Sequence, residues 1–295
     1  MMRHLHTVLL LVLLSATGLR AQQVEQLSLY QVNPYVINPA YAGTSGDFEV
    51  ALMNRNQWSG VEDAPRTFTL SLVAPFKDPH IAMGGYLFVD NAGPTRRTGI
   101  QTSFSYHVRF NDEVQLGLAA SLGVLQFAID GTRITLSEGG DPALYNTYNR
   151  QLLFDAKFGA YMYGSKYHIG VTLPQLLRNQ VTLYESPDPS MNRLEDHYMV
   201  TGAYRFDFGD FGVEPSVLVK YVDPAPIKID ASVRAFYRDQ FWLGGSWRSN
   251  DAVVAMVGYE WQEQLSVALA YDYTTSSLQG VAGNTAELVL GFRFR

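Results

Sequence analysis

Large apolar side chains alternate with small or polar ones over long stretches, and this alternation most constrains the fold of the chain. In the segment 264–274, one parity carries Leu265, Val267 and Leu269, followed by two tyrosines. The other parity carries only small or polar residues, which are Ser266, Ala268, Ala270, Asp272 and Thr274. Because successive side chains of a β-strand point to opposite faces, the pattern predicts strands with one apolar and one polar face.

About fourteen such segments follow one another, and many contain about 9–13 residues. They lie near residues 48–56, 66–74, 80–89, 97–110, 114–127, 151–163, 166–173, 196–208, 211–222, 226–237, 240–247, 251–261, 264–274 and 285–295. A tilted strand needs about 9–11 residues to cross a bilayer, whereas soluble strands most often contain about five or six. The lengths therefore favour strands that cross a membrane.

The connections between the segments differ in length from one side to the other. Those after even-numbered segments are short, such as Gly164–Ser165 and Gly209–Asp210, whereas 128–150 and 174–195 are long. Outer-membrane barrels have short periplasmic turns and longer extracellular loops. We therefore predict an all-β fold, a transmembrane antiparallel β-barrel of about fourteen strands. The alternative, a soluble β-sandwich, explains neither the strand lengths nor this asymmetry.

Composition and the first residues bear on location and partners. The chain has no cysteine, which excludes a disulfide scaffold, a thiolate metal site and a cysteine nucleophile. A net charge of −6 argues against a nucleic-acid partner. Residues 1–21 carry a basic start, an apolar run and a small-residue exit, which predicts a signal peptide cleaved after Ala21. We expect an exported protein of the cell outer membrane.

Charged residues occupy the parity that faces the barrel interior. They are Arg109, Asp155, Lys157, Lys228, Asp230, Arg234, Glu260, Asp272 and Arg293, with His107, Glu214 and Lys220 beside them. Two interpretations stay open. Opposite charges on neighbouring strands can pair and satisfy a polar lumen, or the charges can line a channel or a ligand cavity.

Ser103, Ser105 and His107 share one strand face and resemble parts of a hydrolase site. Residues two apart on one face lie about 6.6 Å apart at about 3.3 Å per residue, beyond hydrogen-bond reach. A third, orienting acid cannot be placed. We also find no metal-ligand spacing, phosphate loop or dinucleotide fingerprint. The sequence therefore predicts a non-enzymatic protein without a cofactor.

The segment 22–47, between the signal peptide and the first strand, contains two Asn-Pro steps. They are Asn33-Pro34 and Asn38-Pro39, which favour extended and turn conformations and exclude a continuing helix. With three tyrosines, the segment is too apolar for a free tail. We expect it at the periplasmic rim or in the lumen, either as a plug or as a strand that docks a partner. The domains are then 1–21, 22–47 and the barrel 48–295.

The stretch Asn38 to Gly43 reads NPAYAG, and it resembles the hallmark of the PorP/SprF family of Bacteroidota outer-membrane proteins. Further similar elements are Arg55-Asn56-Gln57-Trp58, the run 65–71, Gly84-Gly85 with 90–94, and the run 173–177. The resemblance covers essentially the whole chain after the signal peptide. Family-motif residues that could dock a partner are Asn33, Pro34, Asn38, Pro39, Ala40, Tyr41, Ala42, Gly43, Arg55, Asn56, Gln57 and Trp58.

The resemblance implies an accessory of type IX secretion, associated with gliding motility. Such a protein supports the secretion or surface anchoring of a partner adhesin, or of cargo with a C-terminal sorting domain. The implied partners are outer-membrane lipid, that cargo, and periplasmic components of the secretion complex. The residues leave a second interpretation open, an outer-membrane channel or carrier for small solutes.

Overall fold

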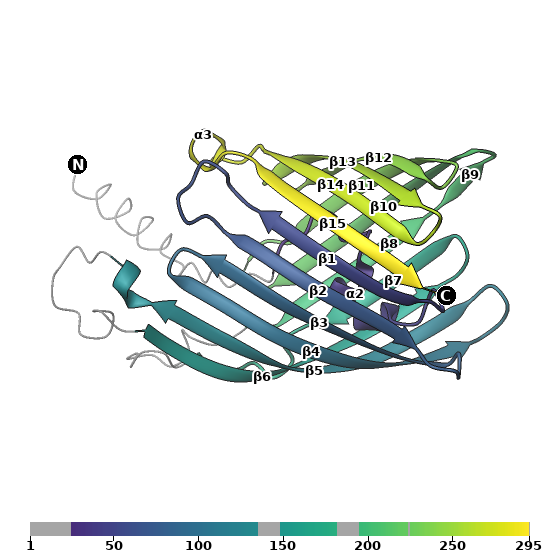
Figure 1. Cartoon of the computed structure of the whole chain (residues 1–295), viewed down its shortest axis with the longest axis horizontal. Coiled ribbons are helices and arrows are strands. Elements are labelled where there is room, and N and C mark those ends of the chain that lie inside the picture. Colours follow the sequence, from purple (N-terminus) through teal and green to yellow (C-terminus); the bar gives the residue numbers. More distant parts are fainter. Residues whose placement is uncertain (1–24, 135–147, 182–194, 224, 295) are drawn as a thin grey trace, which may run out of the picture.

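The computed structural model describes residues 25–134, 148–181, 195–223 and 225–294. The expected signal peptide lies outside these residues. Fifteen strand segments form one closed antiparallel sheet in the described chain (Figure 1). Their bounds are β1 Phe48–Asn56, β2 Arg66–Pro75, β3 Ile81–Ala92, β4 Thr95–Arg109, β5 Gln115–Asp130, β6 Tyr148–Tyr163, β7 Tyr167–Leu173, β8 His197–Tyr204, β9 Phe206–Phe208, β10 Phe211–Val222, β11 Lys228–Tyr237, β12 Phe241–Arg248, β13 Ala252–Trp261, β14 Leu265–Thr274 and β15 Thr285–Phe294.

The segments β8 and β9 together make one strand of the wall. Both pair with β10, and only Arg205 separates them. Pro215 of β10 lies in the stretch opposite this break, and proline cannot donate a ladder hydrogen bond. β15 pairs with β1 from Phe48–Phe294 to Asn56–Ala286, which closes the sheet. The described residues thus form a closed barrel of fourteen strands, which confirms the predicted fold.

The two faces of the wall differ as the alternation predicts. Leu122, Phe154 and Leu243 point outward and are 66–69% exposed. On the inner face, Ser121 and Asp155 are buried. Outward aromatic residues gather at the turns of one rim, among them Phe208, Phe211, Phe241 and Trp261. An apolar outer band with aromatic girdles is the surface that a barrel presents to lipid.

The two rims of the barrel carry different connections. One rim, the short-turn end, holds tight turns, the start of β1 and the end of β15 (Figure 1). Its turns at Arg238-Asp239 and Gln262-Glu263 have φ between 51° and 57°, a conformation that matches the twist of a hairpin. The other rim, the long-loop end, holds the longer connections, with η2 Gly131–Arg133 and α3 Gln279–Ala282. In barrels of this class the short turns are periplasmic.

Residues 25–47, here called the lumenal segment, run through the barrel from the long-loop end to the short-turn end. The segment contains α2 Pro34–Ile37 and η1 Pro39–Tyr41, and α2 lies inside the barrel in Figure 1. Its apolar side chains pack with inward-facing residues of β1, β8 and β10–β15 into the largest buried cluster. The core of the protein therefore lies between this segment and the wall. Among the described residues, no helix has the length and apolar character needed to cross a membrane.

Candidate functional site: the lumenal segment and its socket

Each Asn-Pro step of the lumenal segment starts a helix of a single turn. Pro34 opens α2 and Pro39 opens η1, where the missing N–H of proline costs no hydrogen bond. Asn38 caps η1, because its Oδ1 accepts a hydrogen bond from the Ala40 N–H at 3.0 Å. No helix therefore runs through either Asn-Pro step, as predicted: α2 begins at Pro34 and ends before Pro39.

Asn38 also joins the segment to the wall. Its Nδ2 donates to the carbonyl oxygens of Ala160 on β6, at 3.0 Å, and Val171 on β7, at 3.3 Å. The side chain is 1% exposed. One buried amide therefore satisfies a helix end and links two neighbouring strands to the segment.

Four inward-facing glycines on β3, β5, β6 and β7 make room for the segment, and we call them the glycine socket: Gly84, Gly117, Gly159 and Gly170. A Cβ on Gly159 would lie 2.2 Å from Asn38 Oδ1, and one on Gly84 would lie 2.4 Å from the Tyr35 ring. A Cβ on Gly117 would lie 2.6 Å from the Ala40 carbonyl oxygen. These distances are shorter than any van der Waals contact. The lumenal segment therefore fits against the wall here only because the four socket positions are glycines without side chains.

The end of the NPAYAG stretch is held by the residues that resemble a hydrolase site. The Ala42 carbonyl oxygen accepts hydrogen bonds from Ser105 Oγ and His107 Nε2, both at 2.7 Å. Ser103 Oγ lies 2.9 Å from the hydroxyl of Tyr35. The shared strand face therefore positions three side chains against the lumenal segment.

Gly43 ends the stretch with a φ of +96°. A Cβ at this position would also lie 2.6 Å from the Cβ of Ala82. Both the backbone conformation and the close approach require glycine here.

A second set of contacts holds the segment near the long-loop end. We call Arg55, Arg248, Asp230, Asp272 and Glu287 the latch. Arg55 pairs with Asp272 and Glu287, both at 2.8 Å. Arg248 pairs with Asp272 at 3.0 Å and with Asp230 at 3.1 Å. All five side chains are at most 3% exposed, and Lys220, 3.4 Å from Asp230, balances the third carboxylate, so the charges are paired away from solvent.

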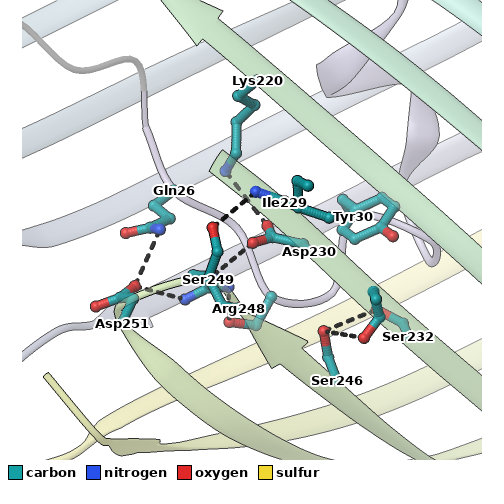
Figure 2. Close-up of polar contacts among 12 residues, drawn as sticks. Gln26, Tyr30, Lys220, Ile229, Asp230, Ser232, Ser246, Arg248, Ser249 and Asp251 are labelled. Atoms are coloured by element: carbon teal, nitrogen blue, oxygen red, sulfur yellow. Dashed lines mark hydrogen bonds and ion pairs between the residues drawn. The ribbon is translucent and has the colours of Figure 1, made fainter. Parts of the chain in front are cut away.

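The latch binds the lumenal segment through its carboxylates and through Arg55 and Arg248, which both donate to Ser28 Oγ. Glu287 accepts hydrogen bonds from the backbone N–H groups of Ser28, at 2.8 Å, and Leu29, at 2.9 Å. Ser28 Oγ donates to Asp272 at 2.8 Å. Figure 2 shows the neighbouring contact, in which Gln26 donates to Asp251 at 3.1 Å.

The other predicted lumenal charges lie in several places. Asp155 and Lys157 are buried on β6, and Lys157 Nζ donates to the Val36 carbonyl oxygen at 3.3 Å. Arg234 pairs with Glu214 at 2.5 Å. A final group is half-buried or exposed: Lys228 and Glu260 are half-buried, Arg293 lies 3.5 Å from Glu49, and Arg109 is 57% exposed beside Asp112. Arg109 differs from the expectation because β4 ends there and its side chain reaches the turn.

The Arg55–Trp58 stretch divides between the latch and the rim. Arg55 points inward, whereas Asn56 is exposed and Gln57 donates its N–H to the Pro65 carbonyl oxygen at 2.9 Å. The N–H of Trp58 donates to Thr285 Oγ1 at 3.2 Å. The NPAYAG stretch therefore anchors the lumenal segment near the short-turn end, and Arg55 holds it near the long-loop end.

Sequence reasoning missed that Arg55 and Glu287 contact the segment, and it did not assign Arg248. The signal that could have pointed to Glu287 was its position on the inward-facing parity of the last strand.

Replacing Asn38 by alanine is expected to lower the free energy of unfolding by about 2–3 kcal/mol. The change removes the η1 cap and leaves two buried carbonyl oxygens without this donor. Urea unfolding of the detergent-solubilised barrel measures the effect. Asn56→Ala serves as the control, because the exposed Asn56 side chain bonds only Asn54 within the described contacts. Equal losses in both variants would contradict this role of Asn38.

The described residues hold no group of three or more histidine, aspartate or glutamate side chains placed to bind a metal ion. The Ser103, Ser105 and His107 side chains are occupied by the segment. The geometry is thus that of a barrel whose lumen contains an anchored piece of its own chain.

Comparisons with known proteins give a family and a fold. A family model described as "Type IX secretion system membrane protein PorP/SprF" matches residues 19–292. Comparison with curated proteins gave no match. The Pseudomonas putida toluene transporter TodX is similar in structure, with a TM-score of 0.50 and 10% identity over 88% of this chain and 93% of TodX. The Acinetobacter baumannii outer membrane protein Omp33 has a TM-score of 0.48 and 11% identity over 84% of this chain and 98% of Omp33. At these identities the likeness concerns the fold alone.

Proposed function

The chain belongs to the PorP/SprF family of type IX secretion membrane proteins and lies in the outer membrane, and from this we propose that it is a non-enzymatic accessory barrel of that system. Its task is to support the secretion or surface anchoring of a partner, either an adhesin or cargo with a C-terminal sorting domain. A role in gliding motility is part of the same proposal.

The filled lumen is the observation that carries this proposal. The socket and the latch hold the lumenal segment at both ends, and its apolar side chains are packed against the wall between them. A passive pore works by leaving its lumen open to solute. A barrel that fills its lumen with its own chain is better suited to holding or recognising other proteins at its rims.

The family-motif residues then divide by role. Ala40 and Ala42 are fully buried, so a partner cannot touch them while the segment is seated. We assign the NPAYAG stretch the task of anchoring the segment. Asn56 is exposed at the long-loop end, where a surface partner can reach it.

Deleting the gene is expected to abolish surface display of a specific adhesin, because the accessory that supports its display is lost. Whole-cell immunolabelling of the adhesin measures display, and uptake of a small hydrophilic dye measures outer-membrane permeability, which should not change. Complementation with the wild-type gene is the control. Normal display in the deletion strain would refute the proposal.

A channel or carrier for small solutes is the second candidate function. A cavity of about 210 Å³ near the short-turn end favours it, with Glu214, Arg234 and Glu260 in its lining. Purified protein in liposomes would then conduct ions or take up solutes. The absence of both activities would count against this function.

A further inference from the structure

The wall of the barrel is interrupted beside β6. The ladder between β6 and β7 runs from Tyr163–His168 to Phe158–Leu173 and stops there, although β6 extends back to Tyr148. The chain after β7, residues 174–181, leaves the ladder, and we call it the wall segment. It begins with Pro174, which has no N–H to donate. The strand edge of β6 is therefore covered by irregular chain.

The wall segment joins β6 through isolated contacts instead of a continuous ladder: Gln180 forms a single β-bridge, and its carbonyl oxygen accepts a hydrogen bond from Gln151 Nε2 at 3.2 Å. The Leu176 N–H donates to the Ala156 carbonyl oxygen at 2.9 Å, and the Asn179 side chain donates to the carbonyl oxygen of Phe154. Gln175 and Arg178 have φ values of 59° and 45°. These left-handed residues prevent a regular strand, so the two chains can part more easily here than where a full ladder joins them.

The outer surface at this place is apolar. Leu152 and Phe154 of β6 are 64% and 69% exposed, and Leu176 and Leu177 of the wall segment are 44% and 49% exposed. Large aliphatic and aromatic side chains on the outer wall of a barrel are a surface for lipid. The interruption thus faces acyl chains.

A cavity of about 50 Å³ lies directly behind the interruption. Pro174 and Gln175 line it on the wall side, and Leu27 and Ile37 of the lumenal segment line it on the inside. At about 10–15 Å³ per water-sized group, it holds about three to five such groups. It can therefore take a head group, while an attached chain has to remain outside.

Three buried oxygens at the cavity have no hydrogen-bond partner among the described residues: Gln101 Oε1, Asp155 Oδ1 and Gln175 Oε1. All three are acceptors. Because a buried acceptor without a donor costs free energy, the cavity favours a ligand that carries donors.

The charged side chains that line the cavity sum to zero, because Glu25 and Asp155 balance Arg97 and Lys157. Arg97 contacts Asp90 at 2.6 Å and Glu25 at 3.3 Å, and Lys157 Nζ donates to the hydroxyl oxygen of Tyr86 at 3.0 Å. An ionic head group would lose its hydration and would add an unbalanced charge to this set. A neutral head group with hydroxyl donors avoids that cost.

We propose that this cavity binds the hydroxyl-bearing head group of a neutral single-chain amphiphile, which reaches it from the outer leaflet between β6 and the wall segment. A diol head group donates to Gln175 and to Asp155 or Gln101, and the chain lies against Leu176 and Phe154. This site is separate from the proposed secretion role, and neither depends on the other.

Binding is tested with the full chain in lipid nanodiscs and radiolabelled dodecane-1,2-diol as the probe. We expect saturable binding beyond that of empty nanodiscs. The dimethyl ether of the diol, which lacks donors, should bind at least fivefold more weakly, and so should propane-1,2-diol, which lacks the chain. Gln175→Met should weaken diol binding about 2–10-fold and leave ether binding unchanged. Equal binding of diol and ether, equal binding of propanediol, or no saturable diol binding would overturn the proposal.

The route is tested with paired cysteines, since the chain has none of its own. Oxidising Ala156→Cys/Leu176→Cys should slow diol binding at least tenfold, and reduction should restore it. Ala160→Cys/Val171→Cys joins residues already opposite each other in the β6–β7 ladder and should have no effect when oxidised. An unchanged rate in the oxidised 156–176 variant would exclude access through the wall.

Discussion

Replacing Arg55 by methionine is expected to lower the free energy of unfolding by about 3–5 kcal/mol, the cost of breaking a buried ion pair from one side. Arg55 Nη1 and Nη2 neutralise Glu287 and Asp272, and Nη1 also donates to Ser28 Oγ at 2.8 Å. Without the guanidinium, buried Glu287 loses its arginine partner, and Asp272 has to share Arg248 with Asp230. Methionine fills much of the same volume, so the loss reflects charge and hydrogen bonding. Urea unfolding in detergent, followed by tryptophan fluorescence, measures it.

Arg109→Met is the matched control for this prediction. Arg109 also pairs with an aspartate, but its side chain is 57% exposed and that of Asp112 is 97% exposed. Water screens such a pair, and its removal should cost less than about 1 kcal/mol. In Arg55→Met, unlike Arg109→Met, limited proteolysis should also cut the lumenal segment before it cuts the rest of the barrel. If both variants unfold at the wild-type urea concentration, the latch does not stabilise the barrel.

The wall of the barrel could be predicted from the sequence because side-chain parity in a strand is local. The ends of the longest strands could not. β6 begins at Tyr148, three residues before the predicted start, because Asn149, Arg150 and Gln151 are polar on both parities and carry no alternation. The break between β8 and β9 was also missed, since its cause, Pro215, lies on the neighbouring strand.

The site could be predicted only in part. The Asn-Pro steps and tyrosines of the N-terminal segment predict that it packs against the barrel, and the lumen was one of the two places expected. The socket could not be found, because its glycines lie on four strands and come together only when the barrel is closed. The latch depends in the same way on Arg55 and Glu287 meeting across the β1–β15 closure. Both the socket and the latch depend on the pairing register of strands that are distant in sequence, and the sequence alone does not give that register.

Replacing Gly159 by valine is expected to displace the lumenal segment and open the lumen. A Cβ here would lie 2.2 Å from Asn38 Oδ1 and 2.9 Å from Pro39 Cδ, so η1 cannot remain in its place. Overpacking of this kind costs about 1–3 kcal/mol or more. Liposomes containing the variant should therefore swell faster in small sugars than wild-type liposomes, and the urea midpoint should fall.

Gly245→Val is the matched control. It separates displacement of the lumenal segment from the general effect of placing valine in a strand. Gly245 lies within β12, and the nearest atom to an added Cβ is the Val254 carbonyl oxygen at 3.8 Å. Valine is favoured in strands, so the wall alone should accept either substitution. A loss confined to Gly159→Val must then arise from its contact with the lumenal segment. If the two variants swell and unfold alike, the socket does not hold the segment in the lumen, and the filled barrel loses its structural explanation.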